Sequence, residues 1–201
     1  MNVNSNGERI MANELEDNRP HPNCYWVEPG RLLAGEYPGA SRPDSARKKV
    51  RALLDAGVNF FLDLTELGES TGFGALEPYA DLLVDEAGLR GVTARHCRMA
   101  IRDISVPEPA SAMADILDTI DAEIAGGSVI YVHCWGGIGR TGTVVGCYLV
   151  RRGESGASAL TILDGWWQTV EKAYCRPRSP ETDEQCAFVR NWSQIDPGTR
   201  V

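Results

Sequence analysis

Residues 129–152 read VIYVHCWGGIGRTGTVVGCYLVRR, and this stretch decides the fold class. Residues 129–132 are apolar at every position, which is the pattern of a short strand covered by helices on both faces. Residues 140–152 have helical spacing, with arginines in the last turn and Gly153 directly behind them. A glycine-rich segment therefore joins a buried strand to a helix, an arrangement typical of parallel α/β sheets.

Strand and helix patterns alternate on either side of this unit. Pro107 and Pro109 make residues 100–109 a loop, because proline cannot donate to a strand ladder. Elsewhere the spacing predicts strands at 31–36, 58–64 and 92–99 and helices at 43–56, 78–87, 109–125, 156–172 and 180–193. This alternation predicts an α/β domain with a central, mainly parallel sheet flanked by helices.

The composition indicates one domain with short tails. The chain has 201 residues, of which 43% are hydrophobic and 24% charged. Residues 1–22 lack periodicity and are predicted to be a flexible N-terminal leader, followed by the domain at 23–195 and a tail at 196–201. The first twenty residues lack an apolar secretion segment and no run is long enough to span a membrane, so we expect a cytoplasmic protein.

The charge and the cysteines exclude several classes of protein. The net charge of −8 disfavours a broad basic surface of the kind that binds nucleic acid. An anionic ligand therefore needs a local binding site. The six cysteines include no C-x-x-C pair, which disfavours a zinc site and a disulfide scaffold. We expect reduced thiols and neither a metal nor a cofactor. Four of them are predicted to be small buried hydrophobes: Cys97, Cys147, Cys175 and Cys186.

The segment 133–141 has the composition of an anion cradle. Its glycines let successive backbone N–H groups point inward at a helix N-terminus, where a phosphate binds well. Cys134 heads this loop below the expected phosphorus, and such a position stabilises a thiolate nucleophile. Arg140 can grip two phosphate oxygens with its planar fork, and Thr141 can donate its hydroxyl to the sulfur. The remaining phosphate-binding residues are predicted to be Trp135, Gly136, Gly137, Ile138 and Gly139.

Residues 133–141 resemble the signature of the cysteine-dependent protein tyrosine phosphatases, which is His-Cys, five residues, Arg, then Ser or Thr. The resemblance extends over about residues 24–193 and is greatest to the small dual-specificity-type phosphatases and their bacterial relatives. It implies a central sheet flanked by helices, a phosphocysteine intermediate and an active site at the strand-loop-helix junction. It also implies that His133 hydrogen-bonds the loop and helps to keep Cys134 ionised.

A carboxylic acid must accompany the thiolate, because a proton donor near the leaving oxygen typically accelerates the reaction by about 10²–10⁴-fold. Asp103 follows a predicted strand on a proline-bounded loop. The resemblance implies that it is the general acid and that its carboxylate later activates the hydrolytic water. The alternative is that Asp103 caps the turn or pairs with Arg102. Asp63, in an apolar strand, and Asp115, on a polar helix face, are weaker candidates.

The C-terminal part offers less decisive residues. Residues 179–182 resemble an N-cap with Pro180 at the first helical position. By resemblance to some family members, Gln185 is a possible water-orienting residue, although a solvated position on the helix explains it equally well. The tryptophans of this region are interpreted as packing residues: Trp166, Trp167 and Trp192.

The segment 133–141 and Asp103 together predict a metal-independent phosphomonoesterase. We expect vanadate and phosphate-like oxyanions to inhibit it. By resemblance the substrate is a phosphoprotein or phosphopeptide, with phosphotyrosine favoured because phenolates leave readily. The chain shows no dedicated phosphotyrosine-recognition loop, so a shallow, dual-specificity-like pocket is expected. One alternative is an inositol phosphate, phosphoinositide or small phosphate ester, although the loop itself carries no lysine. Another is a non-catalytic phosphate-binding scaffold, which the intact Cys134, Arg140 and Asp103 disfavour. A sulfur transferase would not explain Arg140 and Thr141.

Overall fold

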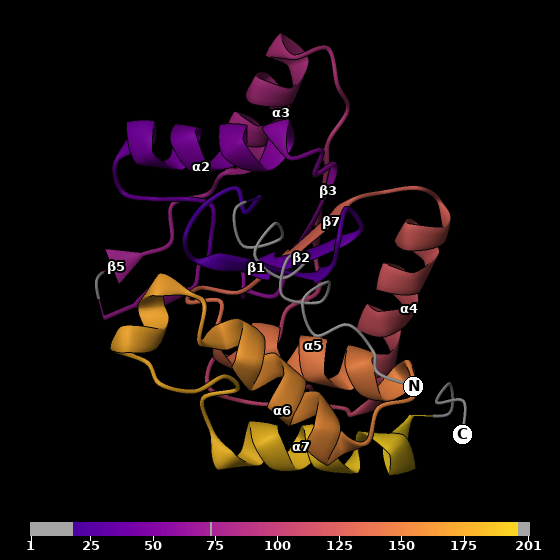
Figure 1. Cartoon of the computed structure of the whole chain (residues 1–201). Coiled ribbons are helices and arrows are strands. Elements are labelled where there is room, and N and C mark those ends of the chain that lie inside the picture. Colours follow the sequence, from indigo (N-terminus) through magenta and orange to yellow (C-terminus); the bar gives the residue numbers. More distant parts are fainter. Residues whose placement is uncertain (1–17, 73, 197–201) are drawn as a thin grey trace, which may run out of the picture.

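The computed structural model describes residues 18–72 and 74–196. At its centre lies a five-stranded sheet with the order β1-β2-β7-β3-β6, in which only the pair β1 and β2 is antiparallel. The predicted α/β fold with a mainly parallel sheet is therefore confirmed (Figure 1). The strands are β1 (Cys24–Glu28), β2 (Leu32–Gly35), β3 (Phe60–Asp63), β6 (Arg95–Arg98) and β7 (Ile130–His133).

The parallel register aligns the carboxyl ends of the three central strands. His133 at the end of β7 is paired with Gly35 of β2 on one side and with Asp63 of β3 on the other. Loops that leave the carboxyl ends of neighbouring parallel strands meet at one edge of a sheet, where such folds bind their ligands. The loop that begins at Cys134 therefore starts at the centre of this edge.

Helices cover both faces of the sheet, as the apolar pattern of residues 129–132 predicts (Figure 1). Tyr131 packs in the cluster on one face, whereas Ile130 and Val132 pack in the cluster on the other, because successive strand side chains alternate. The first face is covered by α2 (Pro43–Asp55) and α3 (Ala80–Leu89). The second is covered by α4 (Ser111–Ala125), α5 (Gly139–Arg151), α6 (Gly156–Trp167) and α7 (Asp183–Ile195).

Two helix boundaries differ from the prediction by three residues or more, the end of α6 and the start of α7. The helix expected at 156–172 ends at Trp167, whose indole N–H donates to the carbonyl of Arg176 at 2.7 Å, and the chain then forms the 3-10 helix η1 (Glu171–Tyr174). The helix expected from 180 begins at Asp183. Thr182 is its N-cap, since its hydroxyl accepts from the amide of Gln185 and the Gln185 side chain accepts from the amide of Thr182.

A small hairpin and both chain ends also differ from the expectation. β4 (Ser70–Thr71) and β5 (Gly74–Ala75) form a two-stranded sheet that the sequence pattern does not reveal. Residues 18–22 contact the domain: Arg19 donates to the carbonyl of Thr169, and His21 bonds to the hydroxyl of Tyr131. Asp196, assigned to the tail, is buried against Arg151. The rest of the expected leader and tail, 1–17 and 197–201, lies outside the described residues.

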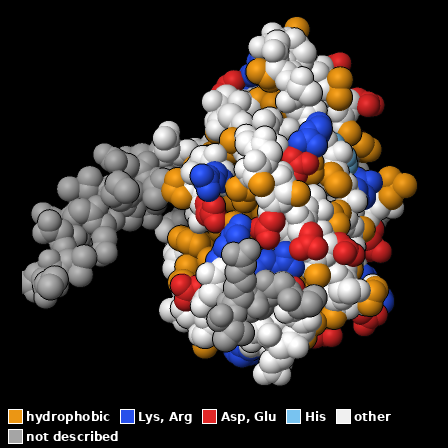
Figure 2. Space-filling model, turned by 90° about the vertical axis from the view of Figure 1, so that its right-hand side faces the viewer, with side chains coloured by type: hydrophobic (Ala, Val, Ile, Leu, Met, Phe, Trp, Pro, Cys, Tyr) orange, Lys and Arg blue, Asp and Glu red, His pale blue; other side chains and the backbone are white. Residues whose placement is uncertain are grey.

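The described residues were compared with the requirements of a membrane span and of a metal site. No helix in 18–72 or 74–196 is both long enough and apolar enough to cross a bilayer. In the same ranges, no cluster of His, Cys, Asp and Glu has the composition of a metal site. On the face shown in Figure 2, acidic and basic side chains are interspersed with hydrophobic ones.

Candidate active site

The loop of residues 134–138 joins β7 to α5 and packs tightly against the end of β2. Gly137 has a φ of +74°, in the left-handed region that favours glycine. A Cβ atom there would lie 2.5 Å from the carbonyl carbon of Gly35 and 2.8 Å from the amide nitrogen of Glu36. Only glycine fits this position, so the loop and the edge of the sheet fix each other's position.

A cavity of about 350 Å³ lies over this loop, and we call it the catalytic cavity. Cys134 and four of its loop neighbours line one part of it. Asp103 and Ile104 line another part, so the structure brings the predicted nucleophile and the predicted acid together from positions far apart in the sequence. The other lining residues, from the chain that precedes α7, are Lys172, Cys175, Arg176 and Glu181.

The buried carboxylate of Glu69 binds the guanidinium group of Arg140. Its two terminal nitrogens donate to the two oxygens of Glu69 at 2.6 and 2.7 Å, and Nη2 also pairs with Asp103 at 2.9 Å. Nη1 donates further to the carbonyls of Leu64 and Ile101. The side chain of Arg140 is 1% exposed, and its Nε atom has no hydrogen-bond partner among the described residues.

Glu69 was not identified from the sequence, because nothing in its local pattern links it to a residue 71 positions later. A bidentate carboxylate fixes the plane of a guanidinium group. Glu69 therefore orients Arg140, whose Nε–H remains a buried donor without a partner among the described residues.

His133 is a neutral, buried link between the loop and the sheet. Its Nδ1 lies 3.3 Å from the carbonyl oxygen of Cys134, and since a carbonyl only accepts, Nδ1 carries the proton. Nε2 then accepts from the hydroxyl of Tyr79 at 2.6 Å. Burial lowers the pKa of His133 to about 4, against the opposing charge of Asp63. His133 thus hydrogen-bonds the loop as predicted, and at neutral pH it carries no charge.

The two weaker candidates for the acid lie outside the catalytic cavity. Asp63 is fully buried and accepts hydrogen bonds from Thr65, His96 and Arg98. Burial alone would raise the pKa of Asp63, but the hydrogen bonds outweigh it and hold that pKa below its usual range. Asp63 is therefore a hydrogen-bonded acid of the core. Asp115 is exposed on α4, also as predicted.

The loop that carries Asp103 is tied to α7. Gln185 is fully buried, and its Nε2 donates to the carbonyl of Ser105 at 3.1 Å, so the suggestion of a solvated helix position is wrong. Ile104 has a φ of 59°, which is a strained conformation for a β-branched residue. Asp103 pairs with Arg140 rather than with Arg102. Strain of this kind persists only where the surroundings fix the backbone.

The structure confirms the predicted burial of some of the other residues and contradicts it for others. Thr141 is buried, and its hydroxyl has no hydrogen-bond partner among the described residues. Cys147 is buried as expected, whereas Cys97 and Cys186 are partly exposed. Cys175 is exposed and lines the catalytic cavity, which corrects its assignment as a buried hydrophobe. It follows the 3-10 helix η1, in which no residue is buried.

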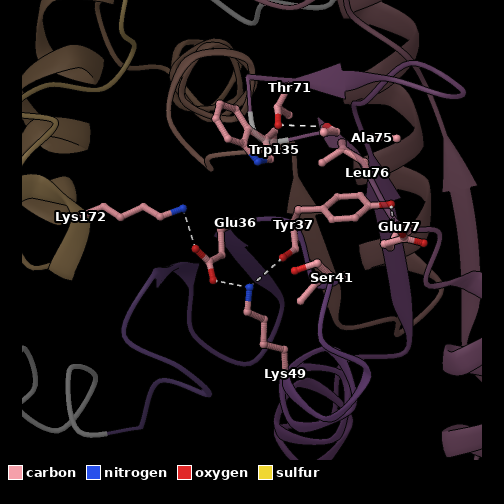
Figure 3. Close-up of a pocket in the computed structure, with 13 residues that line it drawn as sticks. Glu36, Tyr37, Ser41, Lys49, Thr71, Ala75, Leu76, Glu77, Trp135 and Lys172 are labelled. Atoms are coloured by element: carbon pink, nitrogen blue, oxygen red, sulfur yellow. Dashed lines mark hydrogen bonds and ion pairs between the residues drawn. The ribbon is translucent and has the colours of Figure 1, made fainter.

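Figure 3 shows a second cavity of about 250 Å³. Trp135 and Lys172 line both this cavity and the catalytic cavity. Glu36 lies between two ammonium groups, at 2.6 Å from Lys49 and 2.6 Å from Lys172. Burial would raise the pKa of Glu36, but the two lysines outweigh it and lower that pKa. Lys172 also donates to the carbonyl of Gly136, so it contacts the loop directly.

The comparisons with known proteins agree with this geometry. Residues 21–189 match the family described as Swiss Army Knife protein, DSP-PTPase phosphatase domain. The chain is 38% identical over 68 residues to the tyrosine-protein phosphatase CDC14 homolog of Schizosaccharomyces pombe, covering 34% of this chain and 12% of that protein. It is 31% identical over 168 residues to the phosphatidylglycerophosphate phosphatase PTPMT1 of Arabidopsis thaliana, covering 74% and 50%. The chain spans half or less of the length of these curated relatives.

Solved structures share the fold. Tk-PTP in its active form is 24% identical, with a TM-score of 0.57 over 87% of this chain and 99% of that one. Human DUSP28 is 18% identical, with a TM-score of 0.56 over 88% and 96%. PTPMT1 in complex with PI(5)P is 18% identical, with a TM-score of 0.57 over 86% and 95%. With the family match over most of the domain, the chain belongs to the dual-specificity-type protein tyrosine phosphatase family.

Proposed function

We propose that this chain hydrolyses phosphomonoesters, without a metal, through a phosphocysteine intermediate on Cys134. The observation that carries the proposal is the catalytic cavity, which Cys134, the glycine loop and Asp103 line together. A phosphate in this cavity is held by the loop amides at the N-terminus of α5 and by the Nε–H of Arg140. The hydroxyl of Thr141 is a donor for the sulfur once it becomes a thiolate again.

The reaction has two displacements. In the first, the sulfur of Cys134 bonds to phosphorus, the ester P–O bond breaks, and Asp103 gives its proton to the leaving oxygen. In the second, water bonds to phosphorus and the S–P bond breaks. Its electron pair returns to Cys134 as a thiolate, while a carboxylate of the cavity takes the proton of the water. The resemblance to the family assigns this second role to Asp103 as well.

Phosphoproteins are the leading substrate class. The side chain of Asp103 is 44% exposed, so solvent reaches the catalytic cavity there, which suits phosphorylated residues on a protein surface. Tyrosine is favoured over serine, because a phenolate leaves more readily than an alkoxide.

A lipid phosphate or inositol phosphate is the second candidate, and one observation favours it. Lys172 and Arg176 line the catalytic cavity, so it has cations that the loop itself lacks. The Arabidopsis relative is named a phosphatidylglycerophosphate phosphatase. Two cations beside the scissile phosphate would bind a second anionic group of such a substrate.

The expected result of a substrate panel is hydrolysis that continues in EDTA and that vanadate abolishes, with the highest kcat/KM for phosphotyrosine peptides. The panel compares these with phosphothreonine peptides, phosphatidylglycerophosphate and an inositol phosphate. Vanadate inhibits because its trigonal-bipyramidal form resembles the transition state. Loss of activity in EDTA, restored by added metal, would contradict the proposal. A higher kcat/KM for the lipid would select the second candidate.

A further inference from the structure

The second cavity shares a wall with the catalytic cavity. Trp135 and Lys172 belong to both linings, so a group bound in one cavity lies next to the other. The rest of the second lining comes from the loop after β2, from the hairpin of β4 and β5 with the residues after it, and from Lys49 of α2 (Figure 3). A substrate whose phosphate lies over the glycine loop can therefore extend past Trp135 into the second cavity.

Two lysines and one carboxylate form one end of the second cavity. Glu36 bonds Lys49 through one carboxylate oxygen and Lys172 through the other, each at 2.6 Å. The two lysines lower the pKa of Glu36 despite its burial, so Glu36 stays ionised at neutral pH. Two positive charges thus face one negative charge, which leaves a local positive excess in a chain whose net charge is −8. Such an excess attracts anionic groups.

Each of the two ammonium groups keeps one N–H for a ligand. An ammonium group has three N–H donors. Besides the bond to Glu36, Lys49 donates to the carbonyl of Tyr37 at 3.2 Å, and Lys172 donates to the carbonyl of Gly136 at 3.4 Å. The third donor of each has no acceptor among the described residues. The two side chains are 27% and 32% exposed, so a ligand can reach both.

Tyr37 separates this cationic end from an acidic one. Its backbone carbonyl accepts from Lys49, whereas its hydroxyl, at the far end of the side chain, donates to the carbonyl of Glu77 at 3.2 Å. Figure 3 shows Glu77 at the hydroxyl end of Tyr37, away from the two lysines. The cationic end is the one that adjoins the catalytic cavity, since Lys172 lines both.

The lining of the second cavity suits a peptide better than a lipid. An acyl chain needs continuous apolar surface to leave water, whereas an acidic side chain needs only donors. Trp135, Tyr37 and Leu76 are the large apolar or aromatic residues of this lining. The other uncharged residues that line it are small: Gly39, Ala40, Ser41, Thr71, Gly74 and Ala75.

We propose that the second cavity binds a second anionic group of a phosphopeptide substrate. The ammonium groups of Lys49 and Lys172 hold this group while the phosphate to be cleaved lies over the glycine loop, and Glu36 positions the two lysines. The inference rests on the proposed function and specifies its substrate. This is a phosphoprotein segment with a carboxylate or a second phosphate within about two residues of the phosphorylated residue, the reach of a short extended chain.

The test is kcat/KM of the full chain on paired phosphotyrosine peptides. In each pair, one residue within two positions of the phosphotyrosine is either Glu or Gln, which have the same shape and differ in charge. We expect the unaltered protein to prefer the Glu peptide by about tenfold at one or more positions, mainly through KM, as one charge-assisted hydrogen bond would give. A third peptide carries phosphoserine at that position. Whichever acidic peptide has the higher kcat/KM names the source of the second anion.

Lys49→Met removes one of the two cations and lies outside the catalytic cavity. It should make the rates on the Glu and Gln peptides equal. Turnover of p-nitrophenyl phosphate, which has no second anion, should continue and shows that the variant is folded. The matched control is Lys48→Met, an exposed neighbour on α2 that lines neither the catalytic nor the second cavity. It should keep the full preference for the acidic peptide.

Four results would overturn the proposal. The unaltered protein may hydrolyse the acidic and Gln peptides at equal rates at every position. The preference may survive in Lys49→Met, or it may be lost in Lys48→Met as well. Finally, Lys49→Met may lower kcat/KM for a phosphoinositide and not for the acidic peptides, in which case the second cavity binds a lipid headgroup. The proposed function fails separately, if the unaltered protein hydrolyses neither the peptides nor p-nitrophenyl phosphate.

Discussion

Cys134→Ser is expected to leave a folded protein that binds phosphate analogues but hydrolyses p-nitrophenyl phosphate at the background rate. A hydroxyl is far less ionised than a thiol at neutral pH, so the nucleophile is lost while the loop amides remain. The loss should be about 10⁴-fold or more, as when the nucleophile of other covalent enzymes is removed. Steady-state rates and binding of tungstate, measured on the same preparation, check both parts.

The matched control is Cys186→Ser, because Cys186 is a partly exposed thiol on α7 that does not line the catalytic cavity. It should retain full activity. Turnover by Cys134→Ser within tenfold of the unaltered protein, a loss of only about 1.4 kcal/mol in transition-state stabilisation, would exclude covalent catalysis by Cys134.

Asp103→Asn should reduce the rate on a phosphotyrosine peptide by about 10²-fold or more, and the rate on an activated aryl phosphate far less. Phenols of low pKa depart without help, whereas tyrosine, whose pKa is near 10, needs a proton as the bond breaks. The basic limb of the kcat/KM profile against pH should also flatten, since that limb reports the loss of the acid's proton. Rates on a series of aryl phosphates measure this dependence.

Asp115→Asn is the control for this substitution, because Asp115 is exposed on α4 and lies outside the catalytic cavity. It should leave both rates unchanged. If Asp103→Asn lowers the rates on both substrates equally, Asp103 orients Arg140 through their ion pair and does not protonate the leaving oxygen.

The strand-loop-helix unit is predictable from the sequence because its signals are local. The apolar run of β7, the glycines after Cys134 and the helical spacing after Arg140 lie within one short stretch. Gly137 shows the physical reason: its positive φ and its contact with Gly35 admit no side chain. The chain has to place glycine there whatever the rest of the domain contains.

The supporting residues are not predictable in the same way, because they reach the site from distant segments. Glu69 orients Arg140, and Tyr79 bonds His133, yet no pattern around either residue points to the loop. Lys172 and Glu181 line the catalytic cavity from the segment that follows the early end of α6. The early end is itself a tertiary effect, since the indole of Trp167 donates to a carbonyl beyond η1.

The start of α7 has two local signals for a helix N-cap, and only one of them caps the helix. Both Ser179 with Pro180 and Thr182 with Gln185 fit the patterns of a helix start. The structure selects the second, because Thr182 and Gln185 satisfy each other's backbone amides. The hydroxyl of Ser179 instead donates to the carbonyl of Ile138 in the glycine loop.

The phosphocysteine on Cys134 can be detected itself. The unaltered protein is quenched with acid during turnover of p-nitrophenyl phosphate, and its peptides are mapped in a mass spectrometer. Acid unfolds the protein and so stops the enzyme-catalysed hydrolysis of the intermediate. We expect a phosphoryl group on Cys134 and its absence from the Cys134→Ser protein. A phosphoryl group on any other residue, with Cys134 unmodified during turnover, would contradict it.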